Sequence, residues 1–135
     1  VVYSEAGERV TFHAASDFGG IADTLGVWKD VAEKAPTVEF ATVTLADILE
    51  RAKAPRFIHF MSLDIEGAEL EALRGFPFDK FKIGALAIEH NYEEPKRSGI
   101  ETLLKSRGYM RVHTWYQDDF YVPAIPGQQP HLPQE

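Results

Sequence analysis

Cysteine is absent from this chain of 135 residues. Without cysteine the protein cannot form a disulfide, use a thiolate nucleophile or bind a metal through sulfur. The absence also fits a reducing compartment, so we expect a cytoplasmic protein. The sequence has no apolar run that approaches the length of a transmembrane helix, and no signal peptide opens it. We therefore expect no membrane partner.

Basic residues are scarce as well. The chain has 14 Lys and Arg against 21 Asp and Glu, which gives a net charge of −7. Nucleic acid binding needs clustered basic side chains that displace counterions from the phosphates. The acidic balance therefore disfavours nucleic acid and anionic membrane surfaces as partners.

A glycine loop of the nucleotide-binding kind is also lacking. The closest glycine pair, Gly19 and Gly20, follows a polar stretch and has no preceding strand, G-x-G-x-x-G pattern or following helix. We interpret this pair as part of an ordinary loop.

Length and composition allow one domain, since 135 residues with 44% hydrophobic side chains can fill a core. Prolines at positions 123, 126, 130 and 133 exclude a helix or central strand at the end of the chain. We predict a domain over residues 1–122 and an extended Pro-rich tail over residues 123–135.

Hydrophobic periodicity predicts an α/β protein. Residues 1–15 read as a hairpin with Gly7 in its turn, and residues 16–37 as an irregular segment with one short helix. One sheet is expected from strands 38–44, 57–63, 83–88, 109–116 and 120–122, with helices at 45–53, 67–75 and 99–107. Strand 57–63 should run parallel to strand 83–88 because both are almost continuously apolar. Capping boxes are expected at Thr44–Asp47 and Ser98–Glu101, and the aromatic residues of the last hairpin are interpreted as core and edge packing.

The most informative stretch is FIHFMSLDIEGAELEALRGF at residues 57–76. Asp64 and Glu66 stand where its apolar strand gives way to an amphipathic helix. Ligands of open α/β sheets bind beyond the carboxyl ends of the strands. The alternative is that Asp64 only caps the helix. A second junction of the same kind, strand 83–88 followed by Glu89, His90 and Asn91, favours a site.

These motifs resemble the C-terminal half of the FkbM-type methyltransferases. The matching pieces are TLADILE at 44–50, SLDIEGAELEALRGF at 62–76, ALAIEHNY at 85–92, LLKSRGY at 103–109 and DDFYV at 118–122. The resemblance implies a Rossmann-like (class I methyltransferase) fold. It also implies methyl transfer that depends on S-adenosylmethionine (SAM), usually to an oxygen of a small molecule, sugar or lipid.

The resemblance assigns roles to the polar residues at the two junctions. Asp64 and Glu66 are candidate cofactor-binding residues, and Asp64 and His90 are candidate catalytic residues. His90 is the preferred general base, because imidazole titrates near neutrality and Glu89 would hold its charged form. A histidine that only orders its loop is the open alternative. Glu89 and Asn91 are candidate substrate-binding residues, and with Asp64 they are candidate Mg²⁺ ligands, as in catechol-type methyltransferases.

The same comparison implies that the cofactor-binding N-terminal half of the family fold is missing. We therefore expect a partial, mixed sheet that binds SAM weakly or not at all and has little activity alone. Strand 57–63 would then be an apolar edge, which we expect to be covered by a homodimer partner or by the N-terminal hairpin. The alternative function is a non-catalytic, methyltransferase-like module for oligomerisation or binding.

Overall fold

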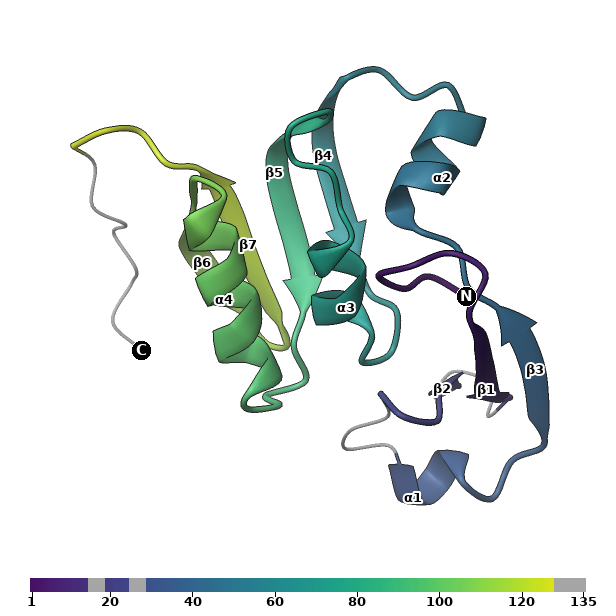
Figure 1. The fold of residues 1–135 in the computed structure, drawn as a ribbon. Helices are drawn as coiled ribbons and strands as arrows, with labels where there is room; N and C mark the ends of the chain where they lie inside the picture. The colour runs from purple at the N-terminus through teal and green to yellow at the C-terminus, as the bar shows by residue number, and fades with distance from the viewer. Residues whose placement is uncertain (15–18, 25–28, 128–135) are drawn as a thin grey trace. The chain divides into compact units, whose positions relative to one another are not determined.

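The computed structural model describes residues 1–14, 19–24 and 29–127, and the chain divides into two compact units. The first unit comprises residues 1–53 and 64–76, and the second comprises residues 54–63 and 77–135. Each unit contains one sheet, and helices accompany both (Figure 1). The predicted α/β class is confirmed.

The first unit contains a three-stranded antiparallel sheet in the order β2-β1-β3. Its elements are β1 Arg9–His13, β2 Gly20–Ile21, α1 Lys29–Ala32, β3 Thr37–Ala41, α2 Leu45–Arg51 and α3 Glu69–Arg74. The short helix α1 confirms the helix expected within residues 16–37. The parts of that segment at residues 16–18 and 25–28 lie outside the described residues.

The N-terminal hairpin prediction is wrong. Strand β1 pairs with β3 and β2, whereas Val2 forms a parallel bridge with Val43. Gly7 does provide a bend, with a φ of +84°, but its N–H donates to the Thr42 carbonyl. The buried Thr42 hydroxyl donates to the Glu5 carbonyl and accepts from the Glu8 N–H. These bonds attach the bend to Thr42, the residue directly after β3, and residues 1–7 do not pair with β1.

The start of α2 confirms the first capping box. The Thr44 hydroxyl accepts from the Asp47 N–H at 3.1 Å, and the Asp47 carboxylate accepts from the Thr44 N–H at 3.0 Å. The two side chains thus satisfy two N–H groups that the helix itself leaves unbonded. The bonds from Thr44 also lower the pKa of Asp47.

The second unit contains a mixed four-stranded sheet in the order β4-β5-β7-β6. Its elements are β4 Phe57–Leu63, β5 Lys82–Glu89, α4 Lys96–Ser106, β6 Tyr109–Trp115 and β7 Asp118–Pro123. Strands β4 and β5 are parallel, as expected, and their register pairs Leu63 with Ile88. The expectation that strand 38–44 joins this sheet is wrong, because β3 pairs with β1.

Helix α4 packs through its apolar side chains, and Ile100 and Leu104 are buried. Burying such a side chain contributes about 2 kcal/mol. The Ser98–Glu101 capping box is wrong, since the helix begins three residues earlier, at Lys96 with Pro95 as its N-cap. Ser98 lies inside the helix, where its N–H and hydroxyl donate to the Glu94 carboxylate and lower the Glu94 pKa. Glu94 therefore supplies the side-chain acceptor at the start of α4 that was expected from Ser98.

The predicted apolar edge is present in the second unit. Among the described residues, β4 pairs with β5 and with no other strand. Phe57 and Phe60 of β4 are 50% and 56% exposed. The N-terminal hairpin that was expected to cover this edge does not form, and the homodimer remains a prediction. No helix of the described residues has the length and apolar character that crossing a bilayer requires.

Candidate functional site

Asp64 and Glu66 lie in a loop of the first unit, directly before α3. Asp64 is exposed and Glu66 is half-buried. Residue Ala68 is the N-cap of α3, and no side chain makes a capping hydrogen bond there. Asp64 therefore does not cap the helix, which removes the structural alternative considered for it.

Glu69 gives the loop its shape. Its side chain is buried, and its Oε1 accepts hydrogen bonds from the Ile65 N–H at 2.9 Å and the Gly67 N–H at 3.1 Å. The backbone between them turns through positive φ at Glu66 (+55°) and Gly67 (+98°), a conformation that glycine adopts without strain. The carboxylate of Glu69 thus orders the loop that presents Asp64.

Glu89 and Asn91 are at the carboxyl end of β5 in the second unit. The Asn91 amide nitrogen donates to Glu89 Oε2 at 2.7 Å. Asn91 and Tyr92 both have positive φ, at +47° and +57°, so the chain turns sharply after the strand. The two candidate substrate residues therefore contact each other at the end where α/β sheets bind ligands.

His90 is buried between this loop and α4. The backbone N–H of His90 donates to the Gln117 carbonyl at 2.8 Å. The ring Nδ1 of His90 accepts from the Tyr92 backbone N–H at 2.9 Å. Because Nδ1 accepts, the proton of the neutral ring is on Nε2, which lies 3.7 Å from Asp119 Oδ1. Burial lowers the pKa of His90, against the attraction of Asp119, so the neutral ring is favoured. These bonds order the loop. A role as base at Nε2 would require the ring proton to be on Nδ1, and the hydrogen bond from the Tyr92 N–H to Nδ1 would then be lost.

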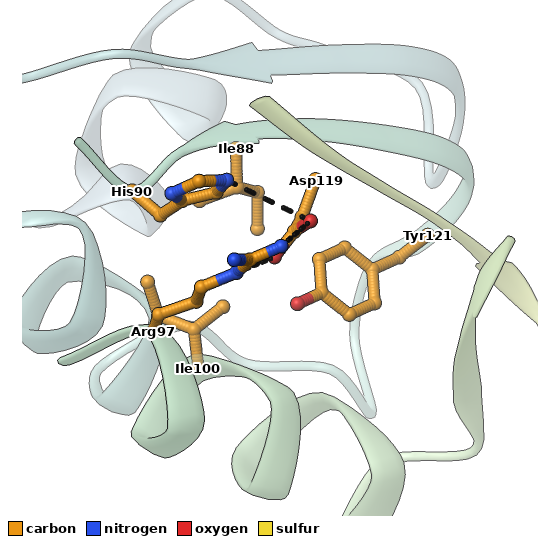
Figure 2. A pocket seen from close by; sticks show the side chains of 6 residues that line it. All are labelled: Ile88, His90, Arg97, Ile100, Asp119 and Tyr121. Carbon is orange, nitrogen blue, oxygen red and sulfur yellow. Dashed lines mark hydrogen bonds and ion pairs between the residues drawn. The ribbon is translucent and has the colours of Figure 1, made fainter. Parts of the chain in front are cut away.

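Sequence reasoning missed Asp119, a buried residue of β7. Its Oδ2 accepts from Arg97 Nε at 2.8 Å and Arg111 Nη1 at 3.1 Å, and its Oδ1 accepts from Arg97 Nη2 at 2.8 Å and the Thr114 hydroxyl at 2.5 Å. Arg111 also faces Glu101 at 3.5 Å. The network joins α4, β6 and β7, and Figure 2 shows His90, Arg97 and Tyr121 around Asp119.

The charges in this network are balanced. Burial acts to raise the pKa of Asp119, but the hydrogen bonds from Arg97 and Thr114 and the two guanidinium charges hold it below its usual value. The bond to Asp119 raises the pKa of Arg97. Burial also strongly raises the pKa of the Tyr121 phenol. Asp119 is therefore an ionised carboxylate held between two cations.

His90, Arg97, Asp119 and Tyr121 line a small pocket closed by Ile88 and Ile100 (Figure 2). His90 Nε2 and the Tyr121 hydroxyl face it without a hydrogen-bond partner. The space has no room for even one water molecule. This pocket is a structural junction, and a ligand would have to bind on the outer side of the loop, near Glu89 and Asn91.

The predicted site residues fall into two groups. Asp64 and Glu66 belong to the first unit, whereas Glu89, His90 and Asn91 belong to the second. Each group is ordered by a buried side chain: Glu69 in the first unit and His90 in the second. The roles that would need both groups together stay predictions.

A family model described as the methyltransferase FkbM domain matches residues 3–110. The chain belongs to the FkbM methyltransferase family. The match includes all of the first unit from Tyr3 onward, well upstream of the segment 43–122 that carries the resemblance. Membership of this family suggests SAM as the methyl donor. Comparisons with curated proteins and with solved structures gave no match.

Proposed function

We propose that this chain provides the acceptor side of a SAM-dependent O-methyltransferase site for a small-molecule, sugar or lipid acceptor. One observation carries the proposal: β4 and β5 are parallel, their ends are in register at Leu63 and Ile88, and polar residues follow each strand. Open α/β sheets bind their ligands beyond such strand ends. Family membership supplies the reaction class.

Bound SAM would supply an activated methyl group on a sulfonium. The exposed carboxylate of Asp64 fits the cofactor, because a carboxylate accepts hydrogen bonds from ribose hydroxyls. Glu66 is the second cofactor-binding candidate. Glu89 and Asn91 would hold the acceptor hydroxyl, and His90 would take its proton. For that step the ring proton must be on Nδ1, which breaks the bond from the Tyr92 N–H, and the loop must turn the free Nε2 of the buried ring toward the acceptor.

Magnesium is a weaker part of the proposal. Asn91 directs its N–H, not its oxygen, at Glu89. A cation shared by the two residues needs both oxygens turned toward it. We therefore assign no step to Mg²⁺, and its proposed ligands Asp64, Glu89 and Asn91 stay a prediction. Addition of Mn²⁺, which broadens nearby NMR signals, tests it: broadening of the Asn91 signals below that of other exposed amides would count against the site.

The proposal is tested by NMR titration of the chain with SAM. Signals of residues 64–66 and 89–91 should shift together, and Asp64→Asn should reduce the shifts. Glu33→Gln is the matched control, because it also removes one exposed carboxylate but lies in the loop after α1. Shifts confined to other residues, or an equal loss in both variants, would contradict the assignment.

A second function is favoured by the unpaired edge of β4. The exposed Phe57 and Phe60 and the free side of the strand could pair with a second copy of the chain. This homodimer could exist with or without catalysis. Sedimentation of the wild type should give a dimer, and Phe60→Lys should give a monomer because an edge lysine opposes strand pairing. A monomeric wild type at high concentration would exclude the edge as an interface.

A further inference from the structure

Two aromatic side chains of the β6–β7 hairpin are exposed, against the interpretation of this hairpin as core and edge packing. Trp115 is 59% exposed and Tyr116 is 73% exposed, whereas Tyr109 and Tyr121 are buried as expected. The rings of Trp115 and Tyr116 meet edge to face at a centroid distance of 5.1 Å. Large exposed aromatic groups that do not fill a core often contact a ligand.

The turn that carries this pair lies beside the candidate acceptor residues. Strand register pairs Glu89 with Asp118 and Asp118 with Trp115, so these three side chains form a row across β5, β7 and β6. Neighbouring strands are about 4.8 Å apart, which puts the backbones of Glu89 and Trp115 about 10 Å apart. The turn and the end of β5 lie at the same end of the sheet (Figure 1).

The row is on the sheet face opposite to α4. Asp119 points toward α4, where Arg97 binds it, and successive side chains of a strand alternate between faces. Asp118 and its neighbours in the row therefore point away from the closed pocket. An acceptor on that face would reach Glu89 without entering the interior.

The turn is also held in place. The bond from the His90 N–H to the Gln117 carbonyl fastens it to the β5 loop, and the Thr114 hydroxyl binds Asp119. The His113 ring stacks with Trp115 at a centroid distance of 6.4 Å. A wall whose side chains are already ordered loses little conformational entropy when a ligand binds.

We propose that Trp115 and Tyr116 form the specificity-determining wall for the methyl acceptor, and that this wall selects a neutral, hydroxylated ring over an anionic one. The inference rests on the proposed methyltransferase function. An indole face packs against the C–H groups of a ring, while a carboxylate beside it accepts hydrogen bonds from hydroxyl groups. Glu89 and Asp118 stand directly opposite each other, and this pair of carboxylates repels an anion.

NMR titration tests the wall with two probes, methyl β-glucopyranoside and the corresponding glucuronide, which differ by one carboxylate. The chain has two tryptophans, so Trp115→Phe identifies the indole signal of Trp115. The neutral probe should shift that signal saturably. The glucuronide should bind at least about 5-fold more weakly, as repulsion by two nearby carboxylates in water implies.

Three variants distinguish a specific contribution of Trp115 and Tyr116 to probe binding from a general effect of replacing an exposed aromatic residue. Trp115→Ala and Tyr116→Asn should each weaken the binding of the neutral probe about 10-fold. Asparagine suits position 116 because Tyr116 has a φ of +49°, a conformation that asparagine tolerates. Phe40→Leu is the control, since Phe40 is another exposed aromatic residue and lies in β3 of the first unit. It should leave probe binding within about 2-fold of wild type.

The inference is overturned if the probes bind equally, if neither shifts the Trp115 signal, or if the wall variants bind like the Phe40 control. A Trp115 signal that moves with protein concentration alone would overturn it too, because the pair would then be a self-association contact. SAM-induced shifts at residues 64–66 that persist in the wall variants keep a failure here distinct from a failure of the proposed function.

Discussion

Replacement of Asp119 by asparagine should strongly destabilise the protein. Asn keeps the size of the side chain but removes the charge that Arg97 and Arg111 share, and its amide N–H₂ replaces one of the two accepting oxygens. Breaking a buried ion pair by removing one partner typically costs 3–5 kcal/mol. Because the Arg97 side chain is still 24% exposed, water can solvate part of it, and we expect about 3 kcal/mol.

Thermal and urea unfolding measure this loss. For a chain of this size, about 3 kcal/mol lowers Tm by about 10 °C. The control is Glu33→Gln, which removes the partner of Lys29 from an exposed ion pair at 3.7 Å, and which should cost under about 0.5 kcal/mol. A loss in Asp119→Asn as small as that of the control would refute the buried network.

The pH dependence of this loss has a fixed sign. The pKa of Asp119 is lowered in the folded protein, so the unfolded state binds a proton first as the pH falls. The stabilisation from Asp119 is therefore complete above the ordinary pKa of aspartate and disappears as the pH falls through the folded value. The difference between wild type and Asp119→Asn should shrink in acid.

His90 and Glu69 give two further predictions. Because burial lowers the pKa of His90, the free energy of unfolding should fall as the pH drops below about 6.5, and His90→Gln should remove this part of the slope. An NMR titration midpoint of His90 above that value would contradict it. Glu69→Ala should cost about 2 kcal/mol and speed amide exchange at Ile65 and Gly67, because their N–H groups lose a charged acceptor. Unchanged exchange at both amides would show that Glu69 does not order the loop.

Local patterns predicted the elements of the second unit well. The apolar runs of β4 and β5 and the Gly108 that follows α4 are signals that the nearby sequence contains in full. The start of α4 was missed because Ser98 and Glu101 fit the capping pattern equally well in sequence, whereas Glu94 reaches the helix from upstream. Capping motifs read from sequence fix a helix start only to within a few residues.

Long-range pairing explains the other differences. The partners of β1 depend on Thr42 holding the bend at Glu5 and Glu8, a contact across more than 30 residues that hydrophobic periodicity does not encode. The Asp119 network also depends on tertiary structure, since Arg97 comes from α4 and Arg111 and Thr114 come from β6. In contrast, Glu89, His90 and Asn91 are neighbours in sequence, so the polar cluster after β5 could be recognised directly.

Calorimetric titration of this chain with SAM tests the central claim most directly. The claim is that these residues provide the acceptor side of the site and few of the contacts that hold the cofactor. Each missing hydrogen bond costs about 1 kcal/mol or more, so several together weaken binding by orders of magnitude. We predict a Kd weaker than the low micromolar range, or no measurable heat. A Kd in the low micromolar range or tighter would contradict the account and show that the chain itself holds the cofactor.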